Sequence, residues 1–177
     1  IDTTNPSTPV ITNSSSGNWT NANVILTASS SDFESGLNRI EYSYDEKSWS
    51  TKWDTAMSDN KVTGTWTTNM NNTVYIRAVD NAGNVSLQTT TSIKIDKTAP
   101  TLSLVTGSYD KTNSNTIVSS SQFGASGGNV SCVNASRSNS AVSKISDIAT
   151  LGVNSITCTA TSNSGMKTTK TSNITIN

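Results

Sequence analysis

Residues 74–84 read VYIRAVDNAGN, a stretch that alternates apolar and polar side chains and then ends in a turn. Val74, Ile76 and Ala78 fall on one face of an extended chain, because successive side chains of a β-strand point to opposite sides. The Asn-Ala-Gly-Asn run at its end is typical of a tight turn in which Gly83 takes a positive φ. The stretch therefore predicts a half-buried β-strand followed by a reverse turn.

The same pattern returns in the second half of the chain. Residues 156–166, ITCTATSNSGM, align with residues 74–84. The opening IDTTNPSTP of residues 1–9 returns as IDKTAPTLS at residues 95–103. Matches at both ends of the repeat indicate two tandem units, and we expect the chain to come from a longer array of them.

Each unit has the composition and rhythm of a two-sheet sandwich. Ser, Thr and Asn fill 81 of the 177 positions, and these side chains divert hydrogen bonds away from a helix. Short alternating runs separated by turn signals follow one another along residues 1–96. We predict one sandwich over residues 1–96 and a second over residues 97–177, with residues 136–148 difficult to place.

Two segments of the first unit carry a resemblance. Residues 74–84 followed by 93–100, IKIDKTAP, resemble strand F, strand G and the linker of immunoglobulin-like domains arrayed in bacterial surface proteins. Residues 40–49, IEYSYDEKSW, are similar to the strand C hairpin of those domains. The resemblance implies an all-β chain of two tandem immunoglobulin-like β-sandwiches, extracellular, used for spacing or adhesion, and without catalytic activity.

The second unit resembles a different variant, the HYR-type immunoglobulin-like module. That module carries cysteines in strands like residues 130–132 and 155–161 of this chain. This unit departs from the module at Ser162 and Met166, where Asp and Asn are usual. The resemblance is therefore less close than in the first unit.

The two cysteines are predicted to form a disulfide. An Asn-Val-x-Cys match to Asn-Val-x-Leu puts Cys132 where the first unit has Leu26, and the repeat puts Cys158 where it has Ile76. We therefore expect them on strands B and F, facing each other across the core. The alternative is two free buried thiols, which pack as small apolar groups. A chain of secreted type with two cysteines favours the bond.

The sequence lacks the side chains of most catalytic sites. It has no histidine, which removes Ser-His-Asp and Cys-His arrangements and the usual zinc ligand. Asp32, Glu34 and Glu41 are close enough in sequence to suggest the carboxylate pair of a glycosidase. We expect instead that the first two lie in a loop and that Glu41 lies on an outer face of the sandwich. No apolar run is long enough for a membrane span, and 12 basic and 12 acidic side chains do not suit a nucleic-acid binder.

Calcium is the one cofactor for which the sequence offers ligands. Asp80, Asn81 and Asn84 place three oxygen-bearing side chains in one turn, and Asp2 or Asp96 lies at a unit end. The alternative is a turn held by its own side chains. The second unit supports that alternative, because it keeps the turn glycine and not the acid.

Partners are predicted from aromatic residues and charge. Trp53, between Lys52 and Asp54, is the tryptophan we expect to be exposed, where it would contact a carbohydrate or a host protein; the alternative is ordinary packing. Residues 1–96 hold 6 basic and 10 acidic side chains, and residues 97–177 hold 6 and 2. Because the two units carry opposite net charge, neighbouring modules of the same parent chain are predicted to attract each other. The alternative is that these charges lie on solvated faces and have no role.

The seam between the units is short. It runs over residues 96–101, contains no glycine, and holds Pro100, which fixes its own φ and pushes Ala99 towards extended geometry. We expect a stiff joint, as a stalk requires.

Overall fold

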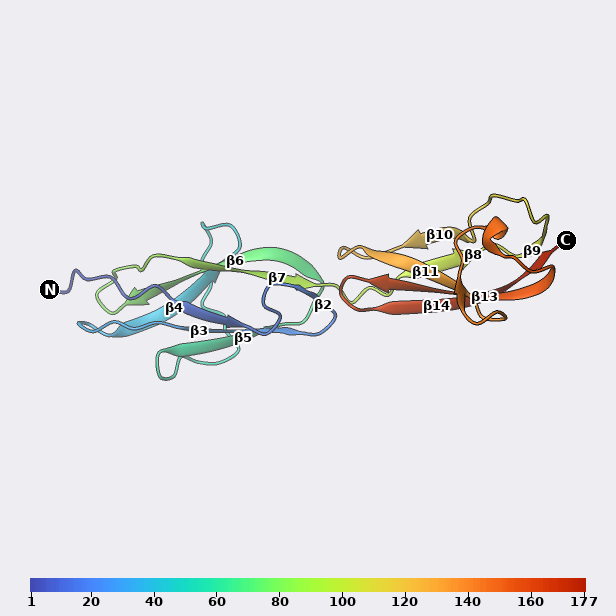
Figure 1. The fold of residues 1–177 in the computed structure, drawn as a ribbon. Helices are drawn as coiled ribbons and strands as arrows, with labels where there is room; N and C mark the ends of the chain where they lie inside the picture. The colour runs from blue at the N-terminus through green and yellow to red at the C-terminus, as the bar shows by residue number, and fades with distance from the viewer. The chain divides into compact units, whose positions relative to one another are not determined.

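The computed structural model describes residues 1–177, and the chain divides into two compact units, Ile1–Asp96 and Lys97–Asn177 (Figure 1). Each unit is a sandwich of two β-sheets around its own core. One short 3₁₀ turn, η1 (Ile145–Asp147), is the only helical segment. Accordingly, no helix here has the length and apolar character that crossing a bilayer requires.

Unit one packs a three-stranded sheet against a four-stranded sheet. The strand orders are β1-β3-β5 and β2-β7-β6-β4, antiparallel throughout except for the parallel pair β2 and β7. This is the immunoglobulin-like arrangement, with strands A, B and E facing strands A′, G, F and C. The strands are β1 (Val10–Asn13), β2 (Trp19–Thr20), β3 (Val24–Ser29), β4 (Leu37–Ser43), β5 (Lys61–Trp66), β6 (Met70–Asp80) and β7 (Thr89–Ile95).

Unit two keeps the larger sheet and reduces the smaller one. Its five-stranded sheet has the order β12-β11-β13-β14-β9, with β14 and β9 parallel, and its second sheet contains only β10 and β8. Residues 136–148, which the sequence left unplaced, form β12 and η1. The strands are β8 (Thr101–Leu104), β9 (Gly107–Tyr109), β10 (Val118–Gln122), β11 (Gly128–Asn134), β12 (Ser140–Ala141), β13 (Gly152–Ser162) and β14 (Lys167–Ile176).

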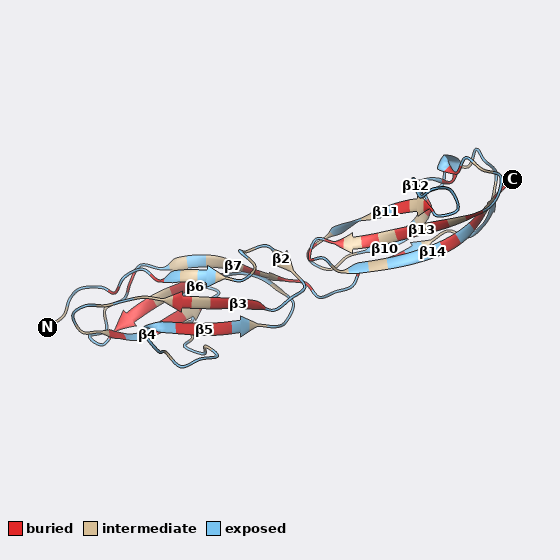
Figure 2. Ribbon diagram, turned by 60° about the horizontal axis from the view of Figure 1, so that its bottom comes forward, coloured by how far each residue is buried: buried red, intermediate tan, exposed pale blue.

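Alternating burial along the strands builds both cores (Figure 2). Val74, Ile76 and Ala78 on β6 are fully buried, as their alternation predicts. In unit two, Ile156, Cys158 and Ala160 on β13 are buried in the same way, so the repeat in sequence is a repeat in structure. The remaining core residues of unit one are Val24, Leu26, Ala28, Leu37, Ile40, Val62, Ile93 and Ile95; those of unit two are Leu102, Ile117, Cys132, Val142, Ile145, Ile148, Ile174 and Ile176.

The disulfide is present, but not where the sequence alignment put it. Cys132 lies on β11 and is the direct cross-strand neighbour of Cys158 on β13, within one sheet. By the repeat, the pair corresponds to Tyr42 and Ile76, which are opposed in the same way on β4 and β6. The expected match of Cys132 to Leu26, on strand B across the core, is therefore wrong. A four-residue alternating motif fits any half-buried strand, so it could not tell strand B from strand C.

Candidate functional site

Three carboxylates gather where the chain enters unit one. Asp32 follows β3, Asp80 ends β6, and Asp2 lies in the N-terminal segment. Their oxygen atoms all lie within 4.8 Å of one another. Asp2 and Asp80 were among the predicted calcium ligands, whereas Asp32 was expected in a loop with no part in that site. The signal that brings them together is topological, because the loops after strands B and F of such a sandwich lie at the same end.

Each of these carboxylates already accepts hydrogen bonds. Asp32 Oδ2 accepts from the backbone N–H groups of Ser35 at 2.9 Å and Gly36 at 2.7 Å. Asp2 accepts from the backbone N–H groups of Thr4 at 2.8 Å and Ser35 at 3.1 Å. Hydrogen bonding, from the Ser35 side chain first and then from Thr4, lowers the pKa of Asp2 below its ordinary value. The group is therefore held in its charged form.

Asp80 closes the turn that follows β6. Its Oδ1 accepts from the backbone N–H of Asn84 at 2.8 Å and its Oδ2 from the Asn84 side chain at 2.7 Å, and Gly83 has φ 95°. In unit two, Ser162 Oγ accepts from the backbone N–H of Met166 at 2.9 Å. An acid and a hydroxyl thus close the same turn, as the turn interpretation requires.

The other predicted calcium ligands are engaged elsewhere. The Asn81 side chain donates to the Ser35 carbonyl at 2.9 Å and accepts from Asn38 at 3.0 Å. Asp96 follows β7, beside the beginning of β6 and at the opposite end of the sheet from Asp80. The structure therefore groups Asp80 with Asp2 and Asp32, and not with Asp96. Three carboxylates are suitable ligands for Ca²⁺, and calcium binding stays a prediction.

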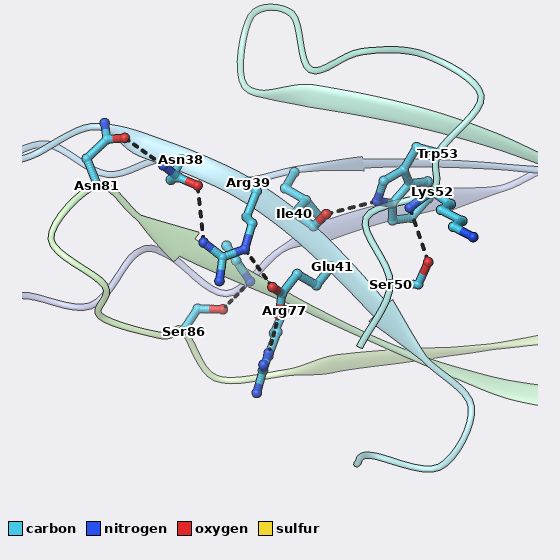
Figure 3. A network of polar contacts seen from close by, with 11 residues as sticks. Asn38, Arg39, Ile40, Glu41, Ser50, Lys52, Trp53, Arg77, Asn81 and Ser86 are labelled. Carbon is cyan, nitrogen blue, oxygen red and sulfur yellow. Dashed lines mark hydrogen bonds and ion pairs between the residues drawn. The ribbon is translucent and has the colours of Figure 1, made fainter. Parts of the chain in front are cut away.

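Glu41 is a buried acid in a polar network on the outer face of the larger sheet of unit one (Figure 3). It accepts from Arg39 Nε at 2.6 Å and from Arg77 Nε at 2.8 Å. The Arg77 guanidinium also lies 3.9 Å from the centre of the Trp49 ring. Burial disfavours the charge of Glu41, but the two arginines outweigh it, so its pKa lies below the ordinary value. We expected Glu41 on this outer face, and its neighbours cover it there.

The aromatic residues of unit one form a packed cluster. Trp53 and Trp66 lie edge to face with Tyr42, with ring centres 5.2 and 5.7 Å from it. The indole N–H of Trp53 donates to the Ile40 carbonyl at 2.9 Å. A Cβ on Gly64 would lie only 3.0 Å from Trp66 and 3.1 Å from Trp53, so the rings rest on the β5 backbone. This cluster closes the side of the sandwich between β4 and β5.

The geometry gives Trp53 a structural role. The residue is half-buried, and its one polar group is already paired. A ring that stacks on a sugar needs an open face, which is why exposure was the expectation for this residue. Ligand contact by Trp53 stays a prediction that the geometry does not favour.

Comparisons with known proteins reach the fold only. No known family model matches the sequence, and no curated protein is similar in sequence. The N-terminal eight Ig domains of Down Syndrome Cell Adhesion Molecule align with 96% of this chain at TM-score 0.67 and 12% identity. An I-band fragment of titin aligns with 97% of it at TM-score 0.54 and 8% identity. The chain spans 25% and 63% of those two structures. At such identities the likeness shows an immunoglobulin-like sandwich and nothing of the activity.

Proposed function

We propose that this chain is a non-enzymatic, extracellular stalk and adhesion module of a bacterial surface protein, which spaces a distal binding region from the cell. The parent would be an array of immunoglobulin-like units, and neighbouring modules of that array would be the partners. The second unit would be an HYR-type variant. The proposal rests on the way in which each unit ties down its own end of the seam.

Both ends of the seam are anchored. The backbone N–H of Asp96 donates to the Thr20 carbonyl at 3.0 Å, which fixes it to unit one. The carbonyl of Pro100 accepts from Thr168 Oγ1 at 2.6 Å, and Pro100 is buried in unit two. Only residues 97–99, all exposed, separate the two anchors. A joint this short, without glycine and next to a proline, is the property that a spacer needs. This observation carries the proposal.

The disulfide and the sequence support the extracellular and non-enzymatic parts of the proposal. Cys132 and Cys158 form a disulfide, and disulfides persist in oxidising compartments such as the extracellular space. Ser-His-Asp and Cys-His chemistry is impossible without histidine. The competing function, binding of carbohydrate or a host protein at an aromatic face, would need Trp53 to be more open than it is.

Small-angle X-ray scattering tests the spacer. We expect a distance distribution typical of an extended two-domain particle. A matched variant with four Gly-Ser pairs inserted between Thr98 and Ala99 should broaden the distribution, because glycine-rich segments behave as random coils. A compact wild-type particle would overturn the proposal. So would a wild-type distribution that does not differ from that of the glycine-serine variant.

A further inference from the structure

The two cysteines of the disulfide differ in their surroundings. Cys132 on β11 is 8% exposed, whereas Cys158 on β13 is fully buried. β13 pairs with β11 on one side and with β14 on the other, over seven and ten residue positions. β11 pairs with β12 over only two positions. Cys158 therefore lies between two long strands, and Cys132 lies near a thinly covered side of the sheet.

A hollow of about 290 Å³ lies beside Cys132. It is lined by Val130, Ser131 and Cys132 on β11, by residues 141–143, and by Asp147, and Cys158 is not part of the lining. The backbone N–H of Val142 donates to the Cys132 carbonyl at 3.0 Å, which holds the segment 141–143 next to β11. The volume is close to the lower end of small-ligand pockets, so the hollow suits a small molecule rather than a folded protein.

The position of the hollow favours a reaction at Cys132. A thiolate that attacks a disulfide approaches along the S–S axis, opposite the sulfur that leaves, because its electron pair enters the antibonding orbital of that bond. The strand order β12-β11-β13 places the segment 141–143 and Cys158 on opposite sides of β11. A thiolate in the hollow therefore approaches Cys132 from the side away from Cys158. Attack on Cys158 would have to come from the side of β14, which is paired with β13 at that position.

Asp147 sets the charge of the hollow. Hydrogen bonds from the backbone N–H groups of Lys144 and then Ser143 lower its pKa below the ordinary value, so the carboxylate is charged. Lys144 adjoins Asp147 in sequence but does not line the hollow. A small thiol that carries an ammonium group therefore suits the hollow better than an acidic thiol.

We propose that Cys132 is a site of thiol–disulfide exchange with small thiols that enter this hollow, aminothiols above all. In the first step the thiolate of the small thiol bonds to Cys132 Sγ, the bond between Cys132 and Cys158 breaks, and Cys158 leaves with the electron pair and takes up a proton. A second small thiol then attacks the first, forms a disulfide with it and releases Cys132 as a thiol. The two small thiols have then supplied two electrons to the protein disulfide.

The exchange acts on unit two alone. Unit one contains no cysteine, so small thiols leave it unchanged. Unit two loses its cross-link between β11 and β13 in their presence and regains it when they are oxidised. The chain therefore carries one unit that responds to thiols next to one that does not.

Mass spectrometry of the full chain treated with cysteamine tests the site. The reaction is quenched with acid, free thiols are alkylated with N-ethylmaleimide in urea, and trypsin separates the cysteines, because Arg137 and Lys144 lie between them. We expect cysteamine on Cys132 and maleimide on Cys158, with the reverse product about tenfold or more rarer, since access decides which sulfur is attacked. The rate should rise in proportion to the cysteamine concentration.

Two tryptophan variants locate the route of entry. Ala141→Trp narrows the hollow and should slow the exchange about tenfold, because the attacking thiol must reach the sulfur. Val153→Trp, at an exposed position of β13 outside the lining, is the control and should react like the wild type. Urea unfolding of both variants compares their stabilities.

Several outcomes would overturn the proposal. Equal labelling of the two cysteines in the wild type, or a rate that does not depend on the cysteamine concentration, would show that the thiol attacks only after unit two unfolds. Absence of reaction with the folded protein would show that the hollow admits no thiol. Equal rates for Ala141→Trp and Val153→Trp, at equal stability, would exclude the hollow as the route.

Discussion

Cys132 and Cys158 are directly opposed across two neighbouring antiparallel strands, at the positions that Tyr42 and Ile76 occupy in unit one. Two homologous places in one chain thus have two different cross-strand contacts. In unit one, aromatic rings from the β4–β5 connection and from β5 cover the pair. In unit two, a covalent bond joins the two strands, and both cysteines are buried in the core. We therefore expect unit one to depend on its aromatic cluster and unit two to depend on its disulfide.

Removing the disulfide should destabilise unit two and leave unit one unchanged. The bond closes a loop with a sequence separation of 26, which corresponds to about 3.5 kcal/mol in the chain-entropy model. We expect Cys132→Ala with Cys158→Ala to lower one of two calorimetric transitions by about 15 °C or more, as such a loss would in a domain of this size. A single transition that moves as a whole would contradict the independence of the units.

Gly64→Ala should disturb the aromatic cluster of unit one. The new Cβ would lie 3.0 Å from the Trp66 ring and 3.1 Å from the Trp53 ring, so both rings would have to shift by a few tenths of an ångström. We expect the free energy of unfolding of unit one to fall by about 1–3 kcal/mol, as is typical of an overpacked core, and the tryptophan fluorescence to change. Thr65→Ala, an exposed position on the same strand, is the control. Equal stability of the two variants would show that the rings do not rest on β5.

Glu41 should contribute stability that is lost in acid. The pKa of Glu41 in the folded protein lies below the ordinary value of 4.5, so the contribution is complete above that pH and disappears as the pH falls through the folded pKa. Glu41→Gln removes the charge at every pH. We expect it to cost about 1–2 kcal/mol at pH 7, discounted because Arg39 and Arg77 are partly exposed, and to flatten the acid side of the stability profile. An unchanged acid slope would assign that slope to other carboxylates.

Periodicity and repetition predicted the fold, because both are local signals. The alternation at Val74, Ile76 and Ala78 identified a strand, and its return at Ile156 indicated a second unit. Very short or fully exposed strands gave no such signal. Only Val118 of β10 is partly buried and the other four residues are exposed, so its serines show no alternation, and the missing third strand of unit two could not be seen in the sequence.

The site was harder to predict, because it depends on contacts between distant segments. Asp32 joins Asp80 only through the meeting of two loops at one end of the sandwich. Trp53 was expected to be exposed between Lys52 and Asp54, but its environment is set by Tyr42 on β4 and Gly64 on β5. Charged neighbours in sequence say little about the side of the chain on which a ring lies.

Variants of Asp80 distinguish its role in closing a turn from a role in binding a metal ion. Asp80 is only 2% exposed, and its carboxylate accepts the hydrogen bond of the Asn84 backbone N–H. We expect Asp80→Ala, which removes this acceptor, to lower the free energy of unfolding by about 1–2 kcal/mol. Asp80→Ser should restore most of that loss, since Ser162 closes the same turn in unit two. Thermal unfolding of the three proteins measures both effects. Repeating it with added calcium tests the cation prediction: a rise in the melting temperature of the wild type that both variants lack would show that the carboxylate binds the ion. The same response in all three would leave Asp80 with the turn alone.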